Sequence, residues 1–168
     1  VIVMTPDELV RRYPQLYHMS EAGSWPSIEK RGLLSTTALL DLFGLTGKER
    51  FSIESQWRPN SVLLTHQGYG TAVVRDQLPM PESKLRECLE GVTPQEWYEL
   101  INGKTFFWVG QTPLIWMLKA APYRNREHWV IVVPTRALLD CHADEVTLSA
   151  INSGSVYPSK ATGVPRLR

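Results

Sequence analysis

Helix-start signals recur along this chain so closely that only short helices fit between them. In several segments a Ser or Thr is followed by a proline, or by a glutamate three residues on, a pattern that caps the first helical turn. These signals predict helices that begin at Thr5, Ser24, Thr46, Thr93 and Thr112. Apolar spacing predicts three more, over Ser35–Phe43, Pro81–Leu89 and Thr135–His142. We therefore expect a fold assembled from many short elements.

Short β-branched and aromatic runs fall between the predicted helices and predict strands. They are Leu16–Met19, Val62–His66, Thr71–Arg75, Thr105–Val109, Trp129–Val133 and Val146–Ile151. The second and third are joined by Gln67-Gly68-Tyr69-Gly70, a glycine-containing loop that favours a β-hairpin. Because the chain has this hairpin and lacks a glycine-rich strand-to-helix turn, we expect an α+β fold rather than a doubly wound nucleotide-binding sheet.

Composition bounds the organisation of the chain. Its 168 residues, 43% of them hydrophobic, contain no repeat or Gly/Ser linker, so we expect a single domain over residues 1–168, with about 157–168 as a tail or loop. The 18 Lys and Arg against 17 Asp and Glu argue against a bulk electrostatic grip on nucleic acid, although a local basic face is still possible. No apolar run approaches the roughly 18 residues of a membrane span, and the start lacks a signal-peptide layout. We expect a cytoplasmic protein without membrane association.

The spacing of cysteine and histidine indicates neither a metal site nor a disulfide framework. Cys88 and Cys141 lie far apart and belong to no CxxC motif, so structural zinc and a disulfide are both unexpected. His66, His128 and His142 have no ligand-like spacing, so we assign no metal.

The segment Leu16–Ser20 contains the first candidate binding residue. A strand that ends near His18, followed by a polar turn and a short helix, places His18 at a sheet edge, where its ring can donate a hydrogen bond to a ligand hydroxyl. The alternative is a structural histidine whose hydrogen bonds are satisfied within the protein.

The order of Tyr17-His18, a short helix, Ile28 and Gly32-Leu33-Leu34-Ser35 resembles the opening of the ADP-ribosyltransferase fold. This fold occurs in DarT-type nucleic-acid ADP-ribosyltransferase toxins, poly-ADP-ribose polymerases and RNA 2′-phosphotransferases. Further motifs resemble an uncharacterised bacterial domain family associated with this fold, over about residues 13–158. They are Val74-Arg75-Asp76-Gln77 with Pro79-Met80, Glu96-Trp97-Tyr98, Phe106-Phe107-Trp108, Ala121-Pro122-Tyr123-Arg124 and Ile151-Asn152-Ser153-Gly154.

The resemblance implies split antiparallel β-sheets with flanking short helices, and NAD+ as the substrate in the cleft between the sheets. His18, with its neighbours Tyr17 and Ser20, would bind the adenosine ribose. Tyr123 would stack on the nicotinamide at the mouth of the cleft, with Arg124 beside it. ADP-ribose would then pass to a nucleic acid or protein acceptor, and nicotinamide would be released.

Transfer of ADP-ribose needs a polar group near the ribose 2′-hydroxyl, where positive charge develops. The third motif of the resembled fold usually supplies a glutamate, and Glu145 is the nearest candidate here, with Asn152 and Ser153 as alternative polar groups. The competing interpretation of Glu145, which follows Asp144, is a solvated charge in a turn. Without the glutamate, the function would be binding, hydrolysis or transfer by a different mechanism.

Arg75, Asp76 and Gln77 form a dense polar cluster directly after an apolar strand. The Arg75 guanidinium could fork onto a pyrophosphate oxygen, with Asp76 orienting it or acting as a base. The alternative is an ordinary salt-bridged strand end.

Two rival functions stay open. One is a non-catalytic module that binds a nucleotide or nucleic acid on the same fold. The other is an RNA 2′-phosphotransferase-like enzyme, for which Arg75, Arg124 and Arg126 are the candidate phosphate-binding residues. The basic residues of 124–128, near Trp129, form either a phosphate-binding patch or a solvated loop. A toxin, phage-defence or nucleic-acid-modifying role follows from analogy of fold alone.

Overall fold

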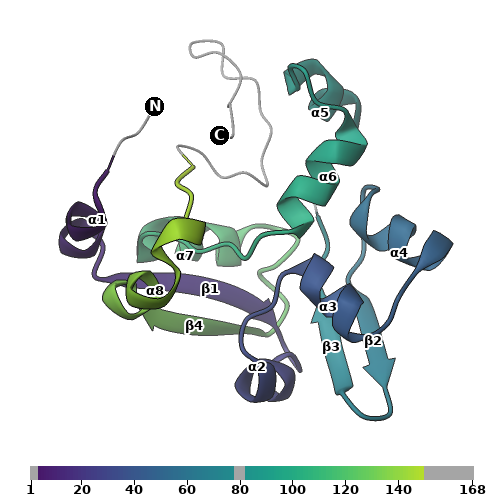
Figure 1. Ribbon diagram of the computed structural model, residues 1–168, viewed down its shortest axis with the longest axis horizontal. Coiled ribbons are helices and arrows are strands. Elements are labelled where there is room, and N and C mark those ends of the chain that lie inside the picture. The colour runs from purple at the N-terminus through teal and green to yellow at the C-terminus, as the bar shows by residue number, and fades with distance from the viewer. Residues whose placement is uncertain (1–3, 78–81, 150–168) are drawn as a thin grey trace. The chain divides into compact units, whose positions relative to one another are not determined.

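A computed structural model describes residues 4–77 and 82–149 and has a mixed α+β architecture (Figure 1). The α+β class expected from the sequence is therefore confirmed. The structure has two small antiparallel sheets, of two strands each. Their strands are β1 (Gln15–Glu21) paired with β4 (His128–Pro134), and β2 (Val62–His66) paired with β3 (Gly70–Val74).

The described residues divide into two compact units, each built around one sheet. The His18 unit comprises residues 4–22 and 106–149, and the hairpin unit comprises residues 23–77 and 82–105. The helices of the His18 unit are α1 (Pro6–Arg12), α7 (Gln111–Lys119), α8 (Thr135–His142) and the 3-10 turn η1 (Ala143–Glu145). Those of the hairpin unit are α2 (Trp25–Arg31), α3 (Thr36–Leu42), α4 (Gly47–Glu54), α5 (Glu82–Cys88) and α6 (Pro94–Asn102).

Strand β1 is hydrogen-bonded along both of its edges. On one edge it pairs with β4, with His18 opposite Ile131. On the other edge Tyr17 and Trp108 form an isolated bridge, in which the two backbone N···O distances are 3.0 and 2.8 Å. An extended chain hydrogen-bonded on both edges is held firmly, so β1 is a rigid support for side chains that project from it.

The two faces of β1 have different partners, because successive side chains of a strand point to opposite sides. Tyr17 and Met19 share one face and form an apolar cluster with Leu114 of α7. Figure 1 shows α7 running beside β1. The second face contains His18 and Ser20, so the apolar cluster and the candidate binding residues are on opposite sides of one strand.

The hairpin unit has its own core. The β2–β3 hairpin packs against α3 and α4 through a cluster of buried apolar side chains. They are Leu40, Phe43, Ile53, Leu64, Ala72 and Val74. A second cluster joins α5 to α6 through Leu85, Trp97, Tyr98 and Ile101.

Most of the predicted helix starts are confirmed. Thr5 and Thr93 each accept a hydrogen bond from the backbone N–H of the glutamate three residues on, and that glutamate returns a bond to the cap backbone. Ser35 caps α3 through a single bond, which its side chain accepts from the backbone N–H of Ala38. Thr46 precedes α4 but makes no side-chain cap bond. These caps satisfy N–H groups that a helix start otherwise leaves without partners.

Three sequence-based boundaries were wrong. Helix α7 begins at Gln111 with Gly110 as its N-cap, not at Thr112. The expected strand Thr105–Val109 is reduced to the single bridge at Trp108, since Val109 and Gly110 bend away into the helix start. Residues 146–149 have no regular structure, and the rest of the expected strand Val146–Ile151 lies outside the described residues.

Among residues 4–77 and 82–149, no helix combines the length and the apolar character that a bilayer crossing requires.

Candidate functional site

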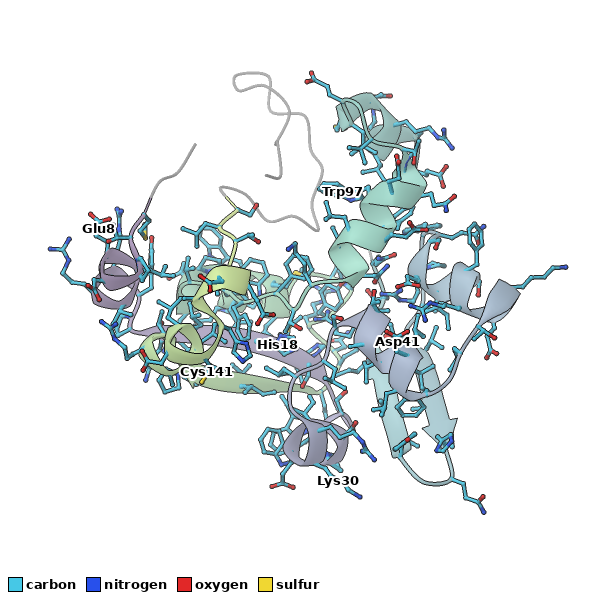
Figure 2. The ribbon with its side chains drawn as sticks, in the orientation of Figure 1. Glu8, His18, Lys30, Asp41, Trp97 and Cys141 are labelled. Atoms are coloured by element: carbon cyan, nitrogen blue, oxygen red, sulfur yellow. The ribbon has the colours of Figure 1, made fainter. Side chains whose placement is uncertain are left out.

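His18 lies in the middle of β1, not at the strand end predicted from the sequence, and its imidazole is held in one orientation. Its Nδ1 lies 2.9 Å from the backbone carbonyl oxygen of Phe106, and the ring lies 5.8 Å from the Phe107 ring, centroid to centroid. Because a carbonyl oxygen only accepts, Nδ1 carries the hydrogen, and in the neutral ring Nε2 is then an acceptor. Figure 2 shows the His18 side chain beside β1. The ring is half-buried, and its orientation is set by the segment that bridges to β1.

Ser20 lies two residues further along the same face of β1. It is 5% exposed, and its Oγ has no hydrogen-bond partner among the described residues. A buried hydroxyl without a partner costs free energy, because it has lost its bonds to water and gained none in return. Trp129, the residue of β4 opposite Ser20, is 50% exposed. This face therefore has an oriented imidazole and an unsatisfied hydroxyl.

Tyr17 and Tyr123 are placed differently from the other predicted binding residues. Tyr17 is a core residue: its ring belongs to the apolar cluster beneath α7, and its hydroxyl donates to Gln15 at 3.1 Å and accepts from Gln111 at 3.1 Å. Tyr123 was expected at a cleft mouth but is only 2% exposed, so that expected exposure was wrong. The cause is the tight turn 120–126, which folds the Tyr123 ring inward and leaves Arg124 exposed.

A polar cluster surrounds Tyr123; sequence reasoning had singled out its Arg126 and His128 as part of a basic patch but had missed Glu21. The Arg126 guanidinium lies 5.8 Å from the centroid of the Tyr123 ring and is ion-paired with Glu21 at the end of β1. His128 Nε2 donates to the Tyr123 carbonyl oxygen at 3.2 Å, while the buried His128 Nδ1 has no partner among the described residues. Glu21 and His128 are opposite each other in the β1–β4 ladder. Glu21 could not be linked to Arg126 or His128 from the sequence, because it is more than 100 residues away from both and only the β1–β4 pairing brings them together.

Glu145, the predicted catalytic carboxylate, lies in η1 rather than at the start of a strand. Its side chain is 78% exposed and pairs with His142 Nδ1 at 3.0 Å, three residues earlier. An exposed carboxylate with a local partner matches the solvated charge in a turn that was the competing interpretation. The alternative polar groups, Asn152 and Ser153, lie outside the described residues.

The cluster Arg75-Asp76-Gln77 follows β3 in the hairpin unit. Gln77 is structural: its Oε1 accepts from the Arg58 backbone N–H at 3.1 Å, and its own N–H donates to the Arg58 carbonyl oxygen at 2.7 Å. Asp76 is buried, and one of its oxygens lies 3.4 Å from Ser61 Oγ. Arg75 is half-buried, and its carbonyl oxygen accepts from Arg58 Nε at 2.7 Å.

Arg58 is the centre of this region, and sequence reasoning did not identify it. The side chain is buried and donates to three acceptors: the Arg75 carbonyl, the Ile53 carbonyl and Asn102 Oδ1, the last at 3.2 Å. Asn102 in turn donates to the Glu54 carbonyl at 2.7 Å. The guanidinium thereby ties the end of α4 and the end of α6 to the strand end that contains the predicted polar cluster.

Burial lowers the pKa of Arg58 to about 10, and the nearby negative charge of Asp76 offsets part of that shift. Taking a guanidinium out of water is costly unless its N–H groups find acceptors. The backbone carbonyls and Asn102 supply those acceptors, so Arg58 is satisfied as a structural group and keeps its charge at neutral pH.

No metal centre is found in the described part of the chain, where no three His, Cys, Asp or Glu side chains are grouped to hold an ion. Cys88 is buried and Cys141 exposed, both as free thiols. A shallow hollow on α1 is lined by Met4, Glu8, Arg11 and Arg12, none of which is a predicted site residue.

Comparison with known proteins gives one finding. A family model described as a family of unknown function, DUF7002, matches residues 14–166. No curated protein and no solved structure matches the chain. The matched region includes β1 to β4 and therefore takes in both compact units.

Proposed function

We propose that this chain, which belongs to the family of unknown function DUF7002, is an NAD+-dependent ADP-ribosyltransferase-like domain that modifies a nucleic acid or protein acceptor. The two small antiparallel sheets support this proposal, because the resemblance of its motifs implies a split pair of sheets with short flanking helices. No metal is required by the proposed chemistry.

The observation that carries the proposal is the pair of polar groups on one face of β1. His18 is held through Nδ1, so that Nε2 accepts in the neutral ring, and Ser20 Oγ is buried without a partner among the described residues. A sugar hydroxyl both donates and accepts, so a ribose could give a hydrogen to His18 Nε2 while a neighbouring hydroxyl satisfies Ser20. Binding a ribose would thus remove the free-energy cost of the unsatisfied Ser20 hydroxyl.

In the proposed reaction the bond between the ribose C1′ and nicotinamide breaks, and its electron pair leaves with nicotinamide. A nitrogen or oxygen of the acceptor forms the new bond to C1′ and releases its proton. The role of His18 and Ser20 is to hold the ribose, so that positive charge develops at a fixed position.

The exposure of Glu145 favours a second candidate function, a non-catalytic module that binds a nucleotide or nucleic acid. Glu145 is paired only with His142 in the described residues and lies outside any strand. A carboxylate held in water stabilises a developing ribose cation poorly, because solvent screens its charge. Such a module would bind NAD+ or ADP-ribose without releasing nicotinamide.

Calorimetric titration with NAD+, combined with a chromatographic assay for released nicotinamide, tests both candidates. We expect measurable binding that His18→Ala weakens about tenfold, the equivalent of one good hydrogen bond. His142→Ala is the matched control, because it removes an exposed imidazole from the same unit and should leave affinity unchanged. Absence of NAD+ binding at millimolar concentration contradicts the proposal, and binding without nicotinamide release favours the module.

A further inference from the structure

Helix α7 has two different faces. Leu114 is buried, and Met117 and Leu118 pack with it against Tyr17 and Met19 of β1. The opposite face is exposed at the helical spacing i, i+3, i+4, i+7. Its residues are Thr112, Ile115, Trp116 and Lys119. Trp116 is 71% exposed, which is unusual for a ring that gains so much from burial.

The chain segment that contains this face has no acidic residue until Glu127. From Phe106 to Arg126 the sequence has no Asp or Glu but has Lys119, Arg124 and Arg126, although the whole chain has a net charge of only +1. Arg126 forms an ion pair with Glu21. Lys119 and Arg124 are exposed, and neither forms an ion pair with any residue of the described ranges. Their charges are therefore available to an anionic partner.

We propose that the outer face of α7, defined by Thr112, Ile115, Trp116 and Lys119, is a docking surface for single-stranded nucleic acid. The Trp116 ring offers a flat surface on which an unpaired base can stack, while Lys119, three residues on, and Arg124, in the following turn, contact the phosphates. In a duplex the face of each base is already stacked on the neighbouring base pairs and cannot stack on Trp116. The arrangement therefore fits a single strand better than a duplex.

The size of the apolar part favours a base over a partner helix. Only Ile115 and Trp116 are apolar on this face, and polar Thr112 and Lys119 stand at either end. Helix-in-groove recognition uses apolar anchors at i, i+3, i+4 and i+7, and here two of these four positions are polar. One stacked ring flanked by cations is instead the pattern of single-strand binding.

This inference goes beyond the proposed function and does not depend on it. Helix α7 covers the face of β1 that contains Tyr17 and Met19, whereas His18 and Ser20 project from the other face. The strand therefore separates the docking surface from the candidate NAD+ site. Binding to α7 can be measured without NAD+, so failure of one proposal leaves the other standing.

Fluorescence anisotropy with labelled twelve-nucleotide oligo-dT and oligo-rU, in about 50 mM salt and without NAD+, tests the surface. We expect the wild-type chain to bind, and Trp116→Ala to weaken binding at least about fivefold through loss of stacking. Trp116→Phe keeps a ring and should stay within about twofold of wild type. Lys119→Glu should also weaken binding and reduce the slope of log affinity against log salt by about 1.

Lys48→Glu is the matched control, because it makes the same charge change at an exposed helical position of the hairpin unit. It should leave binding within about twofold. No oligonucleotide binding by the wild-type chain at 100 µM protein, equal binding by Trp116→Ala and Lys119→Glu, or tighter binding of a duplex of the same length would each overturn the proposal. A dimer in gel filtration that Trp116→Ala converts to monomer, without oligonucleotide binding, would also overturn it and assign the face to a second copy.

Discussion

Arg58 of the hairpin unit and Ser20 of the His18 unit are both buried polar residues, but they differ in how well their polar atoms are satisfied. In the hairpin unit the buried guanidinium of Arg58 has three acceptors, and Asn102 extends the network to the end of α4. In the His18 unit Ser20 Oγ and His128 Nδ1 are buried without partners among the described residues. The Arg58 network is complete within the protein, whereas Ser20 Oγ and His128 Nδ1 lack partners among the described residues, as do Trp97 Nε1 and Tyr98 Oη in the hairpin unit.

This difference distinguishes polar side chains that stabilise the fold from polar side chains that could bind a ligand. A buried network whose members are all satisfied fixes the elements that it joins, and it has little left to offer a ligand. A buried group without a partner is destabilising, so a ligand or a water that supplies the missing hydrogen bond would stabilise the fold. By this criterion Ser20 is a better binding candidate than Arg58, whose donors all have acceptors within the protein.

Arg58→Met is expected to have the largest effect, about 4 kcal/mol less unfolding free energy. It leaves three buried acceptors without donors and Asp76 without its neighbouring cation. Urea denaturation followed by circular dichroism measures the loss. Arg58→Lys, which keeps the charge but not the fork of donors, should recover only part of it. A loss below about 1 kcal/mol would show that the network is not what holds the hairpin unit.

Core substitutions in the two units test whether NAD+ binding depends on the His18 unit alone. Leu40→Ala and Leu114→Ala each remove a buried leucine, of 0% and 4% exposure, and should each cost about 3 kcal/mol. Only Leu114 supports β1, so only its replacement should also weaken NAD+ binding. Urea denaturation measures the stability of each variant, and calorimetry without urea measures its affinity for NAD+. Equal loss of binding in both variants would contradict a site confined to the His18 unit.

Ser20→Ala directly tests the meaning of an unsatisfied hydroxyl. Because the hydroxyl has no partner to lose among the described residues, stability should stay the same or rise by up to about 1 kcal/mol. Affinity for NAD+ should fall about fivefold, since the ligand would lose one hydrogen bond. Thermal denaturation and calorimetry on the same sample give both numbers. A stabilised variant with unchanged affinity would reduce Ser20 to a packing residue.

The smallest expected effect is a change in acid sensitivity at Glu54. Burial alone would raise the pKa of this carboxyl, but hydrogen bonds from Arg50 and Thr37 hold it below its ordinary value of 4.5. A carboxyl with a lowered folded-state pKa adds stability that is present above 4.5 and is lost as the pH falls through the lower folded value. Glu54→Gln should therefore flatten the loss of stability below pH 4.5, measured as urea midpoints across that range.

The capping carboxylates give the control for that experiment. Glu8 in the His18 unit and Glu96 in the hairpin unit also have a lowered pKa, because the backbone of Thr5 or Thr93 donates to each. Their contribution remains in Glu54→Gln, so some acid sensitivity should persist in both units. An unchanged pH profile would contradict the assignment of the Arg50–Glu54 pair as a stabilising one.

The elements that the sequence predicted well are those whose signals are local. Thr5 with Glu8 and Thr93 with Glu96 each lie within one helical turn, and both form the predicted reciprocal caps. The hairpin around Gly68 and Gly70 is equally local, with a loop that its own backbone bonds close. Such features need no knowledge of the rest of the fold, because all their partners are a few residues away.

The parts that could not be predicted depend on distant partners. Arg58 bonds to groups 17 and 44 residues away, and Glu21 finds Arg126 after 105 residues, so spacing contains no sign of either pair. His18 and Ser20 were identified from their motif, but the carbonyl of Phe106 that orients His18 is 88 residues away. Tyr123 was misjudged for the same reason, since burial of a ring is decided by what packs on it.

The alternation of β1 has a consequence for how this domain can change. Tyr17 and Met19 pack against α7, while His18 and Ser20 lie on the opposite face, so residues that stabilise the unit alternate along one strand with residues proposed to bind a ligand. Inserting or deleting a single amino acid before Tyr17 would exchange the two sets and turn His18 toward the packed helix. Divergence within this segment should proceed by replacing residues in place, with its length preserved.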